Sequence, residues 1–143
     1  MWSISTNVLQ NKINDNKIQF TGVNTNTDRI TMAPNNETLF LPLNQDWCIE
    51  FDMFTENIFA FYFLQSSNET GAIYTSTQIS DFTIRYHVKF IYSASNHKIT
   101  YYLDDNLKNT LDTSSFTNNM GFRIVDWQGD VNLTTTNFKA YLI

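Results

Sequence analysis

Short stretches of alternating apolar and polar residues recur along the whole chain, and clusters of Asn, Asp, Ser and Gly separate them. Alternation with a period of two is typical of β-strands that bury one face. No stretch keeps apolar residues at i, i+3, i+4 and i+7 over several helical turns, and the helix-favouring residues Ala, Glu and Leu are scarce. The pattern therefore predicts an all-β chain of antiparallel strands, folded as a two-sheet jelly-roll β-sandwich.

The expected strands cover residues 2–8, 17–20, 30–33, 38–41, 47–54, 58–65, 72–76, 82–92, 98–104, 121–126 and 135–142. Turn-rich clusters such as Asn14-Asp15-Asn16 lie between them. The sequence contains neither an internal repeat nor a linker, and a chain of 143 residues has the usual length of one domain. We therefore expect residues 1–143 to form a single domain.

The alternation also predicts which side chains form the core. One face of each of three strands is apolar, namely Trp47, Ile49, Phe51 and Met53 in the first, Phe82, Ile84, Tyr86, Val88 and Phe90 in the second, and Ile99, Tyr101 and Leu103 in the third. The opposite faces carry polar residues. An antiparallel sheet commonly packs one face on the core and leaves the other in water, so a polar sheet surface is expected.

The charge balance excludes some partners. Only 16% of the residues are charged and the formal net charge is -5, so the chain has no basic field to attract nucleic acid or anionic lipid. Asn, Thr and Ser supply much of the polarity instead, and their neutral hydrogen-bonding groups suit polar ligands such as sugars. Nucleic acid is therefore not an expected partner.

The single cysteine, Cys48, excludes an internal disulfide and lies in an apolar run, where a small buried side chain is expected. The first residues, MWSISTN, lack the charged and apolar segments of a signal peptide. No run approaches the roughly 18 apolar residues of a membrane helix, so membrane insertion is not expected.

Four segments resemble the concanavalin A-like lectin/glucanase superfamily, which includes laminin-G-like domains and many carbohydrate-binding modules. They are WCIEFDM, HKITYYLDDNL, GFRI and NFKAYLI, in that order. The resemblance implies a set of core residues, namely Trp47, Ile49, Phe51, Ile99, Tyr101, Leu103, Phe138 and Tyr141. One departure is that Asp104-Asp105-Asn106 replaces the usual Asp-Gly turn, so a left-handed residue would be Asp or Asn. The Asn-rich composition is also similar to domains of adhesins and phage tail fibres, which suggests an extracellular or virion-surface location.

The glucanases of this superfamily carry Glu-x-Asp-x-Glu or Glu-x-Asp-x-x-Glu, and the corresponding run here is Glu50-x-Asp52-x-x-x-Glu56. On a regular strand Glu50 and Glu56 would lie about 20 Å apart, whereas a retaining glycosidase needs carboxyl groups about 5 to 5.5 Å apart. The chain is also short for such an enzyme. We therefore expect no enzyme activity, with Glu50 and Asp52 as ordinary polar strand residues.

Metal and cofactor sites are not expected either. His87 and His97 lie on different elements without a third ligand at metal spacing. Asp104, Asp105 and Asn106 could supply oxygens to a structural calcium ion, but such a cluster more often forms an ordinary turn.

The best binding candidate is Trp127 in Val-Asp-Trp-Gln-Gly-Asp, with Asp126 and Gln128 beside it. An indole ring can stack on a sugar while the flanking groups hydrogen-bond its hydroxyls. The alternative is that Trp127 covers one end of the sandwich. Further ligand-binding candidates on polar faces are Tyr62, Tyr102, Arg85 and His87, and their alternative role is cross-strand pairing.

These observations favour a non-catalytic carbohydrate-binding or adhesion module of a larger surface, adhesin or tail-fibre protein. Its partner would be a glycan or cell-surface polysaccharide. The alternative is a structural or assembly domain whose outer sheet contacts neighbouring chains. A groove lined by exposed aromatic rings would favour sugar, and a broad apolar patch would favour protein.

Overall fold

The computed structural model describes residues 17–21, 29–32, 41–56, 58–65, 71–126 and 132–143, and the regular elements among them are all β-strands. The strands are β1 (Lys17–Thr21), β2 (Arg29–Met32), β3 (Trp47–Thr55), β4 (Phe59–Leu64), β5 (Ile73–Ser76), β6 (Tyr86–Ser93), β7 (Lys98–Leu103), β8 (Asn106–Asp112), β9 (Gly121–Asp126) and β10 (Asn132–Leu142). Within these ranges no helix has the length and apolar character needed to cross a membrane.

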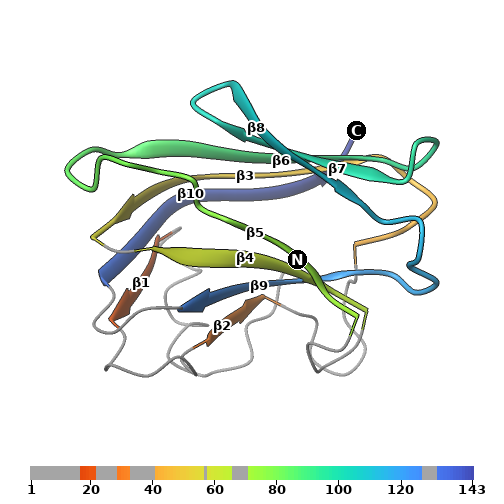
Figure 1. Cartoon of the computed structure of the whole chain (residues 1–143), viewed down its shortest axis with the longest axis horizontal. Helices are drawn as coiled ribbons and strands as arrows, with labels where there is room; N and C mark the ends of the chain where they lie inside the picture. The colour runs from red at the N-terminus through yellow and green to blue at the C-terminus, as the bar shows by residue number, and fades with distance from the viewer. Residues whose placement is uncertain (1–16, 22–28, 33–40, 57, 66–70, 127–131) are drawn as a thin grey trace.

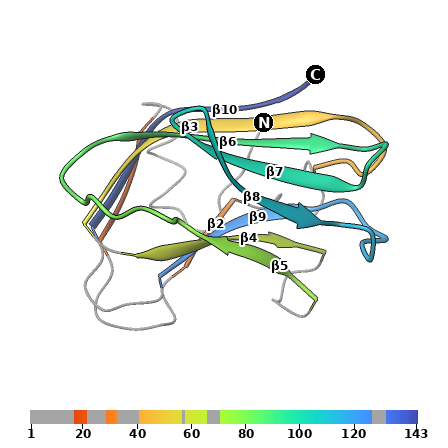
Figure 2. The same ribbon diagram turned by 45° about the horizontal axis from the view of Figure 1, so that its top comes forward.

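The strands form two antiparallel sheets. The larger sheet has six strands in the order β1-β10-β3-β6-β7-β8, and the smaller has four in the order β2-β9-β4-β5. Figures 1 and 2 show β3, β6 and β10 in one layer and β4, β5 and β9 in the other. Strands distant in the sequence, such as β3 and β10, are neighbours in the sheet. This arrangement confirms the predicted all-β, two-sheet jelly-roll sandwich.

Most predicted strands within the described residues are confirmed, with small differences at their ends. The prediction at 2–8 and most of the one at 38–41 fall outside the described residues. The predicted strand at 82–92 begins only at Tyr86. Asp81 Oδ1 accepts hydrogen bonds from the backbone N–H (2.9 Å) and the hydroxyl (2.5 Å) of Thr83, and this local turn interrupts the extended chain.

The late start of β6 corrects two core assignments. Ile84 is 45% exposed and Phe82 is half-buried, because both precede the strand. From Tyr86 onward the predicted alternation holds, and Val88 and Phe90 are fully buried.

Strand β8 is not among the strands predicted from the sequence. Its residues are mostly polar, and Leu111 is its one buried side chain, because β8 forms an edge of the six-stranded sheet. The turn from β7 into β8 places Asp104 and Asp105 at φ values of 50° and 64°. Two successive left-handed residues are typical of a type I′ hairpin turn, so the expected placement on Asp in place of Gly is confirmed.

Aromatic side chains fill the space between the sheets. The ring of Phe61 in β4 lies 5.2 Å from Phe90 and 5.7 Å from Tyr101 across the sandwich, and 5.9 Å from Phe122 beside it. The predicted core faces of β3 and β7 are buried here. Cys48 is also buried, as predicted.

Tyr141 is wrongly predicted as core, since it is 46% exposed on the outer face of the six-stranded sheet. Between two paired positions β10 advances three residues, from Thr136 to Lys139, while β3 advances two, from Asp52 to Glu50. The extra residue is a β-bulge, and it reverses the alternation of side chains beyond it. Tyr141 therefore points outward. The side chain of Phe138 is outside the described residues.

We expect Phe61→Ala to lower the free energy of unfolding by about 3 to 5 kcal/mol, because it removes the ring that contacts both sheets and leaves a cavity. Leu107→Ala is the control, since Leu107 is 60% exposed on β8 and its loss should cost less than about 0.5 kcal/mol. Urea unfolding of the two variants measures the difference. Equal losses would contradict the assignment of Phe61 to the centre of the core.

Candidate functional site

The outer face of the six-stranded sheet carries a row of polar side chains on neighbouring strands. The register pairs Lys139 of β10 with Glu50 of β3, Glu50 with Lys89 of β6, and Lys89 with Tyr102 of β7. Paired residues project from the same face of a sheet. Trp47, Ile49, Phe51 and Met53 point into the core, so Glu50 necessarily points outward.

A second row lies one step along the strands. It consists of Thr136 in β10, Asp52 in β3 and His87 in β6. His87 links the two rows, because its Nδ1 lies 2.9 Å from Asp52 Oδ1 and its Nε2 lies 3.5 Å from Glu50 Oε1. The imidazole is about one-third exposed, with 36% of the side chain accessible, so a ligand on this face can reach it.

Asp52 is held from two sides. Asn137 in β10 donates a hydrogen bond from Nδ2 to Asp52 Oδ2 at 2.8 Å, opposite the contact with His87. These two hydrogen bonds, that of Asn137 first, hold the pKa of Asp52 below its ordinary value because they stabilise the ionised carboxylate. Asp52 therefore remains ionised under neutral conditions.

Glu50 accepts a hydrogen bond from the Tyr141 hydroxyl at 2.5 Å, and this bond is the main reason why the pKa of Glu50 lies below its ordinary value. Hydrogen bonds with Cys48 and Glu50 raise the pKa of Tyr141, so the phenol keeps its proton at neutral pH. Burial raises the pKa of the Cys48 thiol. Glu50 thus lies between an imidazole on β6 and a phenol on β10.

We call Glu50, Asp52, His87, Asn137 and Tyr141 the outer-face cluster. Three cations surround it. Arg85 donates a hydrogen bond from Nη1 to Thr136 Oγ1 at 3.2 Å, and Lys89 lies 3.5 Å from the exposed carboxylate of Asp105. Lys139 pairs with Glu50 in the register and is exposed. The face therefore combines ionised carboxylates with several positive charges.

The structure separates the predicted ligand-binding residues. Arg85, His87 and Tyr102 lie at the outer face of the six-stranded sheet. Tyr62 lies on the outer face of the other sheet, where it stacks on Tyr74 with ring centroids 5.0 Å apart. Trp127 and Gln128, together with the side chain of Asp126, fall outside the described residues.

Sequence reasoning missed two members of the cluster and undervalued two others. The sequence predicts Glu50 and Asp52 on one polar face, but as ordinary strand residues. It predicts Tyr141 in the core, and Asn137 is not among the predicted site residues. Neither could be found from alternation, because the β-bulge shifts the phase of β10.

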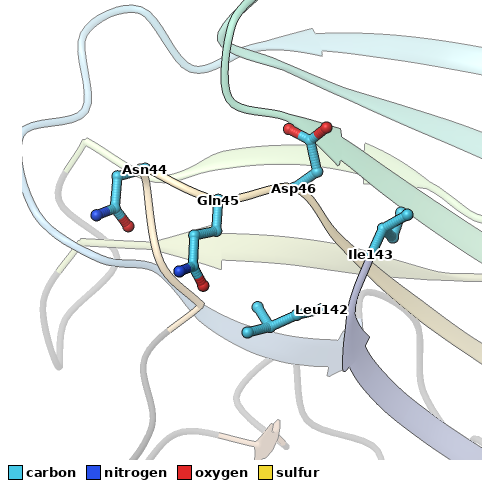
Figure 3. Close-up of a pocket in the computed structure, with 5 residues that line it drawn as sticks. All are labelled: Asn44, Gln45, Asp46, Leu142 and Ile143. Carbon is cyan, nitrogen blue, oxygen red and sulfur yellow. The ribbon is translucent and has the colours of Figure 1, made fainter.

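A pocket of about 430 Å³ lies at one end of the six-stranded sheet, between the segment before β3 and the end of β10. Figure 3 shows its lining residues, which are Asn44, Gln45, Asp46, Leu142 and Ile143. Asp46 is its one ionisable side chain and already accepts a hydrogen bond from the Ala94 N–H at 2.7 Å. The pocket therefore offers fewer ionisable groups for binding or catalysis than the outer-face cluster. Among the described residues, no three His, Cys, Asp or Glu side chains are grouped to hold a metal ion.

No protein-family model and no curated protein matches the sequence. Solved structures do match. The alginate lyase from Corynebacterium sp. has a TM-score of 0.67 at 7% identity, covering 90% of this chain and 78% of the lyase. The polysaccharide lyase family 7 enzyme AlgAT5 has a TM-score of 0.62 at 11% identity, covering 91% and 80%. A sialidase has a TM-score of 0.55 at 12% identity, and the match covers 87% of this chain but 15% of the sialidase.

These similarities show the fold, which is the jelly-roll sandwich of the concanavalin A-like type. They also contradict the prediction that the chain is not an enzyme, because domains of this fold act as lyases. The length of the chain does not exclude a lyase, since this chain covers 78% and 80% of these two enzymes. The spacing of Glu50 and Glu56 bears on one hydrolytic mechanism only, and not on the elimination reaction that lyases catalyse.

The cluster predicts a specific acid sensitivity. Glu50 and Asp52 have folded-state pKa values below their ordinary 4.5 and 3.8. Their contribution to stability is therefore complete above those ordinary values and is lost as the pH falls below them, through the folded-state pKa values. We expect Glu50→Gln and Asp52→Asn each to weaken the dependence of unfolding free energy on pH below about pH 5. Urea unfolding across this range measures the effect, and a wild-type slope in both variants would contradict it.

Proposed function

We propose that this chain binds a carbohydrate across the outer face of the six-stranded sheet, centred on the outer-face cluster. The observation that carries the proposal is the row of carboxylate, imidazole, amide and phenol groups held in fixed positions by one another. Sugars present many hydroxyl groups, and such groups are recognised by arrays of donors and acceptors together with aromatic rings.

Aromatic side chains lie beside these polar groups. Tyr102 pairs with Lys89 in the register and is half-buried, and Tyr141 is 46% exposed on the same face. Rings in such positions can contact the apolar face of a pyranose while neighbouring charges bind its hydroxyls. The polar character of this face supports sugar binding over the alternative of assembly through a broad apolar patch.

Cleavage of an acidic polysaccharide by elimination is a second candidate, and one arrangement favours it. His87 and Tyr141 approach the two oxygens of Glu50 from opposite strands. In an elimination, a base removes the proton beside the sugar carboxylate while an acid protonates the departing oxygen. His87 is the candidate base, and Tyr141, whose phenol keeps its proton, is the candidate acid.

Two observations add to this candidate. A His-to-Asn and Tyr-to-Phe double variant of a family 7 alginate lyase has been solved in complex with substrate, and it matches this chain with a TM-score of 0.57 at 8% identity. The cations Arg85, Lys89 and Lys139 lie where they could neutralise the carboxylate of a uronate.

Binding is tested on an array of neutral and acidic glycans. We expect Tyr102→Ala to weaken the best interaction by about 1 to 3 kcal/mol, because it removes an aromatic contact. Tyr74→Ala, which removes an exposed tyrosine from the opposite sheet, is the matched control and should bind like the wild type.

Trp127→Ala is included in the same array, because Trp127 with Asp126 and Gln128 remains a proposed contact. Weaker binding at unchanged melting temperature would support that contact, whereas a loss of stability with unaltered affinity would remove it. Retained binding by Tyr102→Ala together with loss in Tyr74→Ala would contradict the outer-face proposal.

Cleavage is tested by incubating the wild-type protein with alginate and following the unsaturated uronate ends that elimination creates. We expect product from the wild type and a loss of at least about 100-fold in His87→Ala and Tyr141→Phe, the usual contribution of general acid–base groups. Tyr74→Phe serves as the control for a tyrosine hydroxyl outside the site. The absence of product from the wild type would reject cleavage of alginate, while the array result would stand independently.

A further inference from the structure

The β-bulge in β10 contains Asn137, one of the few described residues with a left-handed backbone. Its φ is 55°, and it lies between the paired positions Thr136 and Lys139. Asn tolerates this conformation better than most residues, although a positive φ still costs free energy in a residue with a Cβ. Bulges and left-handed residues are concentrated at functional sites, where they re-aim a side chain.

The side chain re-aimed here is that of Asn137 itself. Its Nδ2 donates to Asp52 Oδ2 at 2.8 Å, across the gap between β10 and β3. Asp52 has two carboxylate oxygens, and the other one, Oδ1, lies 2.9 Å from His87 Nδ1. The three residues therefore form a chain of hydrogen bonds from the bulge to the imidazole.

A carboxylate held by only one hydrogen bond can rotate about its side-chain torsions. With one oxygen fixed by Asn137, the second oxygen of Asp52 has a defined direction and accepts a hydrogen bond from the N–H of His87 Nδ1. The ring then presents its other nitrogen, Nε2, toward Glu50 and solvent. The histidine tautomer is set by the hydrogen bond that its opposite nitrogen makes.

We propose that Asn137 is a positioning residue, whose placement in the β10 bulge orients Asp52 and thereby fixes the ring and tautomer of His87. This role rests on the proposed function only in that it concerns the same face of the protein. An amide suits the position because it donates without charge, whereas Asp at residue 137 would place a second carboxylate against Asp52.

A hydrogen bond beside the bulge holds the bulge in place, so the side chain of Asn137 keeps one direction. Arg85 donates from Nη1 to Thr136 Oγ1 at 3.2 Å, immediately before the bulge. Arg85 precedes β6, the strand that carries His87. This hydrogen bond thus joins the segment before β6, the strand of His87, to β10, the strand of Asn137.

Asn137→Gly separates the effect of the side-chain amide from that of the backbone conformation. Gly adopts a positive φ without strain but lacks the hydrogen-bond donor. The matched control is His97→Gly, which places Gly at another left-handed position, φ 52°, in the turn between β6 and β7. His97 is one of two histidines, so its removal also leaves His87 as the single imidazole signal. All variants are therefore made in the His97→Gly background.

Long-range ¹H–¹⁵N NMR correlations report which ring nitrogen of His87 carries the proton when the imidazole is neutral. We expect the control to hold the proton mainly on Nδ1, and Asn137→Gly to shift the tautomer ratio toward Nε2 by about 3- to 10-fold, which lies within the range of coupling between neighbouring residues. Carboxyl ¹³C titration should show the pKa of Asp52 moving toward its ordinary 3.8. Asn137→Asp should disturb the ring at least as strongly.

A double-variant cycle identifies the route. In an Asp52→Asn background, Asn137→Gly should no longer change the tautomer ratio, because the intermediate carboxylate is gone. An unchanged ratio in Asn137→Gly, or an equal change with and without Asp52, would overturn the proposal. These measurements need no ligand, so a failure to find any bound glycan would reject the proposed function and leave this test intact.

Discussion

The aromatic layer between the two sheets is the interaction on which the rest of the structure depends. Phe61, Phe90 and Phe122 lie with ring centroids less than 6 Å apart, and their burial removes large apolar surfaces from water. Because strand residues alternate, every ring that points into this layer sends its neighbours outward. The outward direction of Glu50, Asp52 and His87 is therefore a direct consequence of how the core packs.

One irregularity turns that face into a site. Along a regular β10, Leu133 and Thr135 point inward, and residues 139 and 141 would follow them. The β-bulge after Thr136 reverses this phase and brings Lys139 and Tyr141 beside Glu50. The same bulge directs Asn137 toward Asp52. A single extra residue thus converts a row of solvated side chains into a connected cluster.

Proteins with different functions share this fold. Alginate lyases and a sialidase are among the matching structures, and so is the binding domain of botulinum neurotoxin DC in complex with rat synaptotagmin II, with a TM-score of 0.59 at 9% identity. This sandwich is thus used both for catalysis and for binding. Function in such a fold depends on the residues placed on its surfaces.

The amino-acid sequence by itself determined the sandwich and the core faces of β3 and β7, since alternation depends only on local backbone geometry and burial. It also placed His87 and Tyr102 on polar faces. The edge strand β8 could not be predicted from the sequence, because an edge strand with few apolar residues has a weak alternating pattern. The partnership of His87 with Asp52, and of Tyr141 with Glu50, was decided by the tertiary structure alone. Strand register and the phase shift at a bulge arise from pairing between segments far apart in the chain, and no local pattern records them.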